Sequence, residues 1–134
     1  MLFSKELRGA ERAMDGYALR FQAAAHNLAN IHTPGYQKRV VDFESSLKQA
    51  ISLAEDHIDP DRPMDGPLPN PAAALNDWLP RMSVVENRAQ RIDGNGITLE
   101  EESAHVTRAA GKFNLLAAWV AAEYRGLKYV IDAK

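Results

Sequence analysis

The segment FQAAAHNLANIHTPGY, residues 21–36, contains the end of a long apolar repeat and the turn that stops it. Upstream, apolar residues recur at alternating steps of three and four, which keeps one side of an α-helix apolar. No proline interrupts residues 2–31, so the pattern predicts one helix about 45 Å long at ~1.5 Å per residue. The apolar stripe of this predicted helix consists of Leu7, Ala10, Met14, Tyr17, Phe21, Ala24, Leu28 and Ile31.

Pro34 and Gly35 are expected to end this helix. A proline disfavours helical geometry at the preceding residue, Thr33, and a Pro-Gly pair fits the two central positions of a type II turn. Gly35 would then adopt the positive φ that other residues adopt at a cost. Asn27 and Asn30 lie close enough to the helix end to hydrogen-bond free carbonyls or turn backbone.

The middle of the chain is predicted to be broken. Val40 and Val41 lead into a short amphipathic helix, and five of the thirteen residues from 59 to 71 are proline, which predicts an extended loop. A small apolar patch follows, with a short strand near residues 81–86, and then a double turn at residues 93–96. The short helix has Phe43, Leu47, Ala50, Ile51 and Ala54 on one face, and the patch consists of Trp78, Leu79, Met82, Val84 and Val85.

The last third predicts a second long helix. Thr98 followed by Glu101 forms a capping box, and the acidic residues Glu100 to Glu102 suit the positive end of a helix dipole. The second apolar stripe has near-heptad spacing, and it consists of Leu99, Val106, Ala109, Phe113, Leu116, Val120, Tyr124, Leu127 and Ile131.

These patterns predict a mainly α chain with coiled-coil-like packing of its terminal helices. Its organisation within one structural domain is an N-terminal region (1–58), an irregular insert (59–97) and a C-terminal helix (98–134). The two stripes either pack against each other in an antiparallel bundle or meet neighbouring subunits. Periodicity does not separate these alternatives.

Composition limits the function before any motif is considered. The 134 residues carry 16 basic and 18 acidic side chains, for a net charge of −2, so no basic excess indicates a nucleic-acid partner. The absence of cysteine excludes disulfide scaffolds, thiolate zinc sites and cysteine nucleophiles. The longest uncharged apolar run, Leu115 to Ala122, is too short to cross a bilayer, and the charged N-terminus lacks a signal-peptide core. We therefore expect a soluble chain without a membrane span or a cleaved signal.

One spacing has metal-binding character, Glu102-x-x-His105, because residues three apart share a helix face in di-iron bundles. Such a site needs a second motif of the same kind and two further carboxylates, which the sequence does not supply. Glu102 and His105 are therefore expected to be solvated. The Lys38-Arg39 pair is too small for a nucleic-acid footprint and is also expected to be solvated. No serine lies in a nucleophile elbow, and no glycine loop has phosphate-binding spacing. The sequence predicts no catalytic, cofactor-binding or metal site.

The stretch that ends the first helix resembles the N-terminal signature of the bacterial flagellar rod and hook protein family. A second run, DGNGITLEEE at residues 93–102, resembles the C-terminal segment of the proximal rod proteins in this family, as does Arg125-Gly126-Leu127. Together the two runs and their helices cover about the first fifty and the last forty residues. The N-terminal residues that match the signature are Asn27, Leu28, Ala29, Asn30, Thr33, Pro34, Gly35 and Tyr36.

This resemblance implies a structural subunit that polymerises helically through its terminal helices into the basal-body rod and transmits torque from motor to hook. It also implies export through the flagellar type III apparatus without signal cleavage. The implied partners are further rod subunits, both self and FlgC-like, together with the adaptor FliE and the MS-ring protein FliF. The alternatives are a helical binding or chaperone module of the export system and, from Glu102 and His105, a metal-binding bundle.

Overall fold

The computed structural model describes residues 2–55, 73–85 and 97–132, and two long helices dominate it. This mainly α architecture with long terminal helices confirms the fold class predicted from periodicity. The elements in chain order are α1 (Leu2–Ala29), β1 (Lys38–Val40), α2 (Glu44–Glu55), α3 (Ala73–Asp77), β2 (Ser83–Val85) and α4 (Leu99–Asp132).

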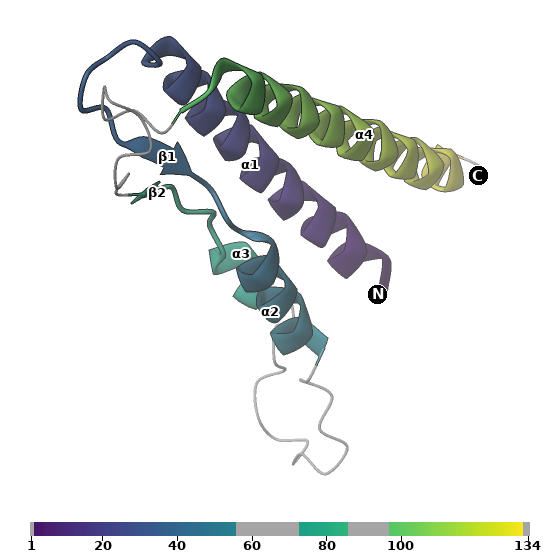
Figure 1. Cartoon of the computed structure of the whole chain (residues 1–134). Helices are drawn as coiled ribbons and strands as arrows, with labels where there is room; N and C mark the ends of the chain where they lie inside the picture. Colours follow the sequence, from purple (N-terminus) through teal and green to yellow (C-terminus); the bar gives the residue numbers. More distant parts are fainter. Residues whose placement is uncertain (1, 56–72, 86–96, 133–134) are drawn as a thin grey trace.

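Helix α1 lies at the centre of the molecule, as Figure 1 shows, with α4 along one side and α2, α3 and the strands along the other. Helix α4 runs antiparallel to α1. Among the described elements, α1 is the only one whose backbone packs along α4. The two terminal helices therefore pair within a single chain, and α4 forms an outer layer.

The apolar core lies between α1 and α2. The predicted apolar face of α2 is buried there, and Trp78 and Met82 of the central patch pack partly against it. Leu79, Val84 and Val85 of the same patch are exposed. Because α2 is only twelve residues long, burial of this face against α1 supplies most of its stability. The buried residues of the core cluster are Ala23, Val41, Phe43, Leu47, Ala50, Ala54 and Leu75.

Strands β1 and β2 form a two-stranded antiparallel sheet, with Lys38 opposite Val85 and Val40 opposite Ser83. Strand β2 lies within the range predicted for a short strand. Strand β1 and the five-residue helix α3 were not predicted, because segments this short carry no measurable periodicity and depend on tertiary contacts. The predicted loop at 59–71 and the double turn at 93–96 lie outside the described residues.

Both predicted helix boundaries have the expected local chemistry. Gly35 has a φ of 71°, and the Tyr36 amide donates to the Thr33 carbonyl at 3.3 Å, as a type II turn requires. At the start of α4 the Glu101 amide donates to Thr98 Oγ1 at 3.3 Å. Helix α1 ends at Ala29, so Ile31 lies in the turn that follows it. Within the described ranges, no helix has the length and apolar character of a membrane span.

Candidate functional site

The first asparagine of the family signature is buried where α1, β1 and α4 meet. Asn27 is 1% exposed, and its Nδ2 donates to the Arg39 carbonyl at 2.8 Å and to Glu102 Oε2 at 3.0 Å. Its Oδ1 accepts from the Arg39 amide at 2.8 Å and from Tyr36 Oη at 3.3 Å. One amide side chain thus attaches both β1 and α4 to the end of α1.

The rest of the signature makes hydrogen bonds that close the end of α1. Asn30 Nδ2 donates to the His26 carbonyl at 2.8 Å, and the Thr33 amide donates to the Asn30 carbonyl at 2.9 Å. Thr33 Oγ1 donates to Asn30 Oδ1 at 3.3 Å. These bonds satisfy carbonyls that a helix end otherwise leaves unpaired. Asn30 therefore makes the predicted contact with a helix-end carbonyl, whereas Asn27 binds β1 and α4 instead of the turn backbone. Leu28 is partly buried, whereas Ala29, Pro34 and Gly35 are exposed.

Buried Glu102 forms an ion pair with partly buried Lys38, which contradicts the expectation that both are solvated. Glu102 is 1% exposed, and Lys38 Nζ lies 2.7 Å from its Oε1. The second oxygen, Oε2, accepts from Asn27. Burying a carboxylate costs several kcal/mol unless its oxygens are paired. The sequence pattern did not reveal the pairing because Lys38 and Glu102 are 64 positions apart.

The metal-binding interpretation of Glu102 and His105 finds no support in this geometry. His105 is exposed, while Glu102 is occupied by Asn27 and Lys38. Within residues 2–55, 73–85 and 97–132, no three His, Cys, Asp or Glu side chains are grouped so as to hold an ion. A cavity of about 230 Å³ lies beside the ion pair. Three of its charged lining residues, Arg20, Lys38 and Glu102, are paired within the chain.

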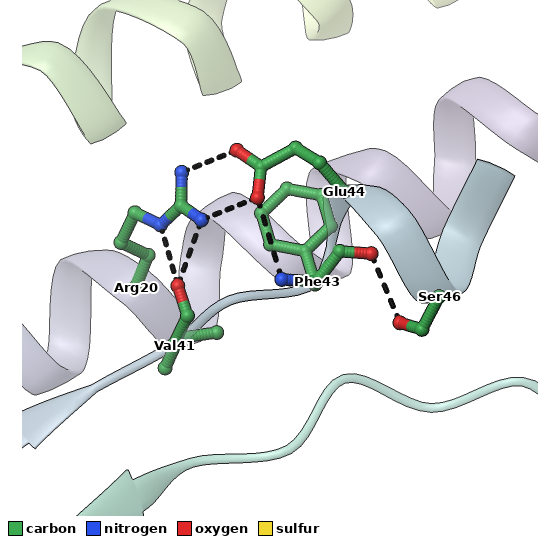
Figure 2. A network of polar contacts seen from close by, with 5 residues as sticks. All are labelled: Arg20, Val41, Phe43, Glu44 and Ser46. Atoms are coloured by element: carbon green, nitrogen blue, oxygen red, sulfur yellow. Dashed lines mark hydrogen bonds and ion pairs between the residues drawn. The ribbon is translucent and has the colours of Figure 1, made fainter. Parts of the chain in front are cut away.

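Arg20 attaches the start of α2 to α1, as Figure 2 shows. Its guanidinium donates to both Glu44 oxygens at 2.6 Å and, through Nε and Nη2, to the Val41 carbonyl at 2.9 and 2.7 Å. It also lies 4.8 Å from the centre of the Phe43 ring. The hydrogen bonds from Arg20 lower the pKa of Glu44 to about 2. The same bonds raise the pKa of Arg20. Arg20 could not be found from the sequence, because its only signal there is an arginine beside the apolar stripe.

The two predicted stripes partly face each other. On α1, Leu7 and Ala24 are buried and Phe21 is 41% exposed. On α4, Ala109 is buried, whereas the ends of the stripe are exposed. The partly buried stripe residues are Ala10, Met14, Tyr17, Leu28, Ile31, Val106, Phe113, Leu116 and Val120, and the exposed ones on α4 are Leu99, Tyr124, Leu127 and Ile131.

Helix α4 has a second apolar side, which the sequence analysis did not recognise. Leu115 is 72% exposed and Tyr129 is 78% exposed, and small residues lie between them. At 3.6 residues per turn, Gly111, Leu115, Ala118, Ala122 and Tyr129 lie on the side of the helix away from Ala109 and Leu116, which face α1. Trp119, Gly126 and Val130 lie at the flank of that side. We call this set the outer face of α4, and it consists of Gly111, Leu115, Ala118, Trp119, Ala122, Gly126, Tyr129 and Val130.

Comparison with known proteins gives full-length similarity to flagellar rod proteins. No protein-family model matches the chain. The flagellar basal body rod protein FlgB of Escherichia coli (strain K12) is 25% identical over 128 residues, which cover 95% of this chain and 93% of that protein. FlgB of Shigella flexneri gives the same values. FlgB of Salmonella typhimurium is 25% identical over 138 residues, which cover 94% of this chain and 92% of that protein.

The similarity spans the signature, the insert and both terminal helices rather than one motif. The full-length similarity and the N-terminal signature indicate the same family. Residues of that signature form the hydrogen-bonded junction of α1, β1 and α4. The full-length similarity, the signature and the pairing of the terminal helices together support an FlgB-like family of flagellar rod proteins for this chain.

Proposed function

We propose that this chain is a structural, non-enzymatic subunit of the bacterial flagellar basal-body rod. Its similarity to FlgB over about 95% of its length supports this role. The structural observation that carries the proposal is the outer face of α4, which exposes large apolar side chains on a helix whose other side is already packed. Such a surface is typical of a protein that assembles with neighbours.

In the assembled rod, the outer face of α4 packs against neighbouring subunits. Burying a side chain such as Leu115 or Tyr129 contributes about 1.5–3 kcal/mol, and several per subunit are needed to offset the entropy lost on association. A surface that meets a different surface on the next copy generates an open helical assembly when the rotation between copies does not close into a ring. Phe21, Tyr124 and Leu127 lie exposed on the predicted stripes and extend the apolar contact. Repeated along the rod, these contacts transmit torque from motor to hook.

The same role assigns partners and a location. The neighbours are copies of this chain and FlgC-like rod subunits, with the adaptor FliE and the MS-ring protein FliF at the base. The chain reaches the basal body through the flagellar type III export apparatus without a cleaved signal. No nucleic acid is involved, in keeping with the net charge of −2.

Charge substitutions on the outer face test the proposal. Leu115→Asp and Trp119→Asp are introduced into the chromosomal copy, and swimming, rod assembly and protein level are measured. We expect loss of swimming and of rods at a protein level close to that of the parent. Ser103→Asp, an exposed change on α4 before the outer face begins, serves as the control and should swim. Normal swimming of both outer-face variants contradicts the assembly role of this surface.

A second candidate is a helical binding or chaperone module of the export system. The observation that favours it is the pairing of α1 and α4 within one chain, which shows that the terminal helices have partners before any neighbour is added. A module of this kind forms a complex of fixed stoichiometry. Sedimentation of the purified chain with flagellar rod subunits separates the two candidates, because a rod subunit adds to growing assemblies.

A further inference from the structure

Three contacts between side chains define the position of α4 along α1. Asn27 meets Glu102, the Lys112 ammonium lies 5.7 Å from the centre of the Tyr17 ring, and Tyr124 Oη donates to Glu11 Oε1 at 2.7 Å. Residue numbers fall along α1 as they rise along α4, which defines one antiparallel register. The Lys112 and Tyr124 contacts are at the surface, whereas the Asn27 contact is buried.

The apolar side chains do not define this register by themselves. Both stripes repeat at steps of three and four, so a shift of seven residues again places apolar side chains against apolar side chains. Helix α4 is also apolar on its outer face, so a rotated helix would bury apolar residues against α1 as well. Among the described elements only α1 packs along α4. Besides this contact, the fully buried Ile97 directly before the first turn of α4 anchors its start.

The buried polar residues remove this ambiguity. In the observed register Glu102 Oε2 accepts a hydrogen bond from Asn27 Nδ2 at 3.0 Å, and Oε1, which accepts no hydrogen bond from the described residues, lies 2.7 Å from the charged Lys38 Nζ in an ion pair. In a shifted or rotated register, Glu102 either lies against apolar residues or leaves Lys38 and Asn27 without their acceptor. A buried carboxylate that loses its partner is strongly destabilising. The polar contacts therefore penalise every alternative arrangement, although they add little stability to the observed one.

We infer that Asn27, Lys38 and Glu102 act as a register lock that selects one arrangement of α4 on α1 from several of similar apolar burial. Buried polar residues set the register of helical coiled coils in the same way. The lock is a property of the single chain and does not depend on the proposed function. The lock also fixes the position and rotation of the outer face of α4 relative to α1. This matters for assembly only if the chain is a rod subunit, so this consequence rests on the proposed function.

The absence of native cysteine makes the register directly measurable. Gln22 on α1 and Lys128 on α4 are both exposed, and Gln22→Cys with Lys128→Cys accepts two spin labels. Double electron–electron resonance on the full chain, diluted with unlabelled chain, then reports the distance between the helices. We expect one narrow distance in the parent. In the apolar variant Lys38→Met with Glu102→Leu, we expect a second population displaced by roughly 10 Å, the rise of seven helical residues.

The control is Lys48→Met with Glu100→Leu, which removes the same two charges from exposed positions and should keep one distance. A single, parent-like distance in the apolar variant overturns the lock, as does splitting in both variants. If the apolar variant loses its helical circular dichroism, the distance measurement is made on the single variant Lys38→Met, and that result tests the register lock. That change leaves the carboxylate buried without its cation in the observed register, so the displaced population must appear, and an unsplit distance overturns the inference. Swimming is not measured, so failure here is distinct from failure of the rod proposal.

Discussion

The ring of Phe43 lies directly against the backbone of Gly16, so that a β-carbon at this position would stand 2.6 Å from Phe43 Cδ2. Gly16 is in the middle of α1, where glycine is about 1 kcal/mol less favourable than alanine. The close contact explains why a glycine is nevertheless present. It lets α2 approach α1 closely enough for Phe43 and Tyr17 to pack edge to face at 5.0 Å.

Gly16→Ala should therefore destabilise the chain, although alanine favours helix. We expect the crowding to cost about 1–3 kcal/mol, reduced by the gain in helix propensity. Gly111→Ala is the matched control, because a β-carbon there meets nothing within 4 Å. The control should be neutral or up to about 1 kcal/mol more stable. Urea unfolding of both variants provides the measurement, and equal free energies of unfolding would contradict the packing described for Phe43.

Asn27→Ala removes four hydrogen bonds at the junction of α1, β1 and α4. It leaves the Arg39 amide and carbonyl without their side-chain partner in a partly buried position. Each unsatisfied buried group costs about 1–3 kcal/mol, so we expect a loss of at least 2 kcal/mol in the free energy of unfolding. Asn30→Ala, which removes bonds at an exposed turn, should cost about 1 kcal/mol. Urea denaturation measures both, and an equal loss in the two variants would argue against a special role for Asn27.

The Arg20–Glu44 pair predicts a dependence of stability on pH. The pKa of Glu44 is lowered from 4.5 to about 2 in the folded chain, so the ionised form is favoured by folding. The contribution is fully present above about pH 4.5 and is lost as the pH falls towards 2. Because the Glu44 side chain is half exposed, solvent screening keeps the effect modest.

Comparison with Glu44→Gln isolates this contribution, because glutamine does not titrate. The difference in unfolding free energy between the parent and this variant should be largest near pH 6 and shrink as the pH falls from 4.5 to 2. Thermal unfolding by circular dichroism at several pH values measures it. A difference that stays constant across this range would show that ionised Glu44 is not what Arg20 stabilises.

Phe21 and Leu116 should respond differently to the same change, since Phe21 is 41% exposed and Leu116 is partly buried against α1. Phe21→Asp should leave the circular dichroism spectrum and protein level near those of the parent while abolishing swimming. Leu116→Asp should also weaken the packing of α4 on α1, with a loss of about 2 kcal/mol or more in the unfolding free energy. Unfolding curves and swimming assays of the two variants check this, and a folded, swimming Phe21→Asp strain would contradict the role of Phe21 in assembly.

Local rules were sufficient to predict the ends of the long helices. Pro34 and Gly35 define a turn through their own backbone preferences, and Thr98 caps α4 through its own hydroxyl, so neighbours in sequence carry the information. The apolar face of α2 follows from the 3.6-residue period in the same way.

Contacts between distant positions could not be predicted by these rules. Lys38 and Glu102 each looked like solvated charges, and only the fold brings them together with Asn27. In the sequence Gly16 is an isolated glycine within a helix. The side chain that requires a glycine there, Phe43, lies beyond the turn and far away in sequence. The outer face of α4 was overlooked for a different reason. When a helix has two apolar sides, the periodic signal of each side is weaker. The near-heptad spacing of the stripe that faces α1 hides the second side.

The most direct test of the rod proposal is whether the chain is a component of the basal body. Hook–basal bodies are purified from the source bacterium, and the chain is quantified by mass spectrometry alongside known rod subunits. We expect the chain to copurify in fixed proportion to those subunits, and we expect the Trp119→Asp strain to yield no hook–basal bodies. Intact hook–basal bodies that contain none of the chain would contradict its assignment as a rod subunit.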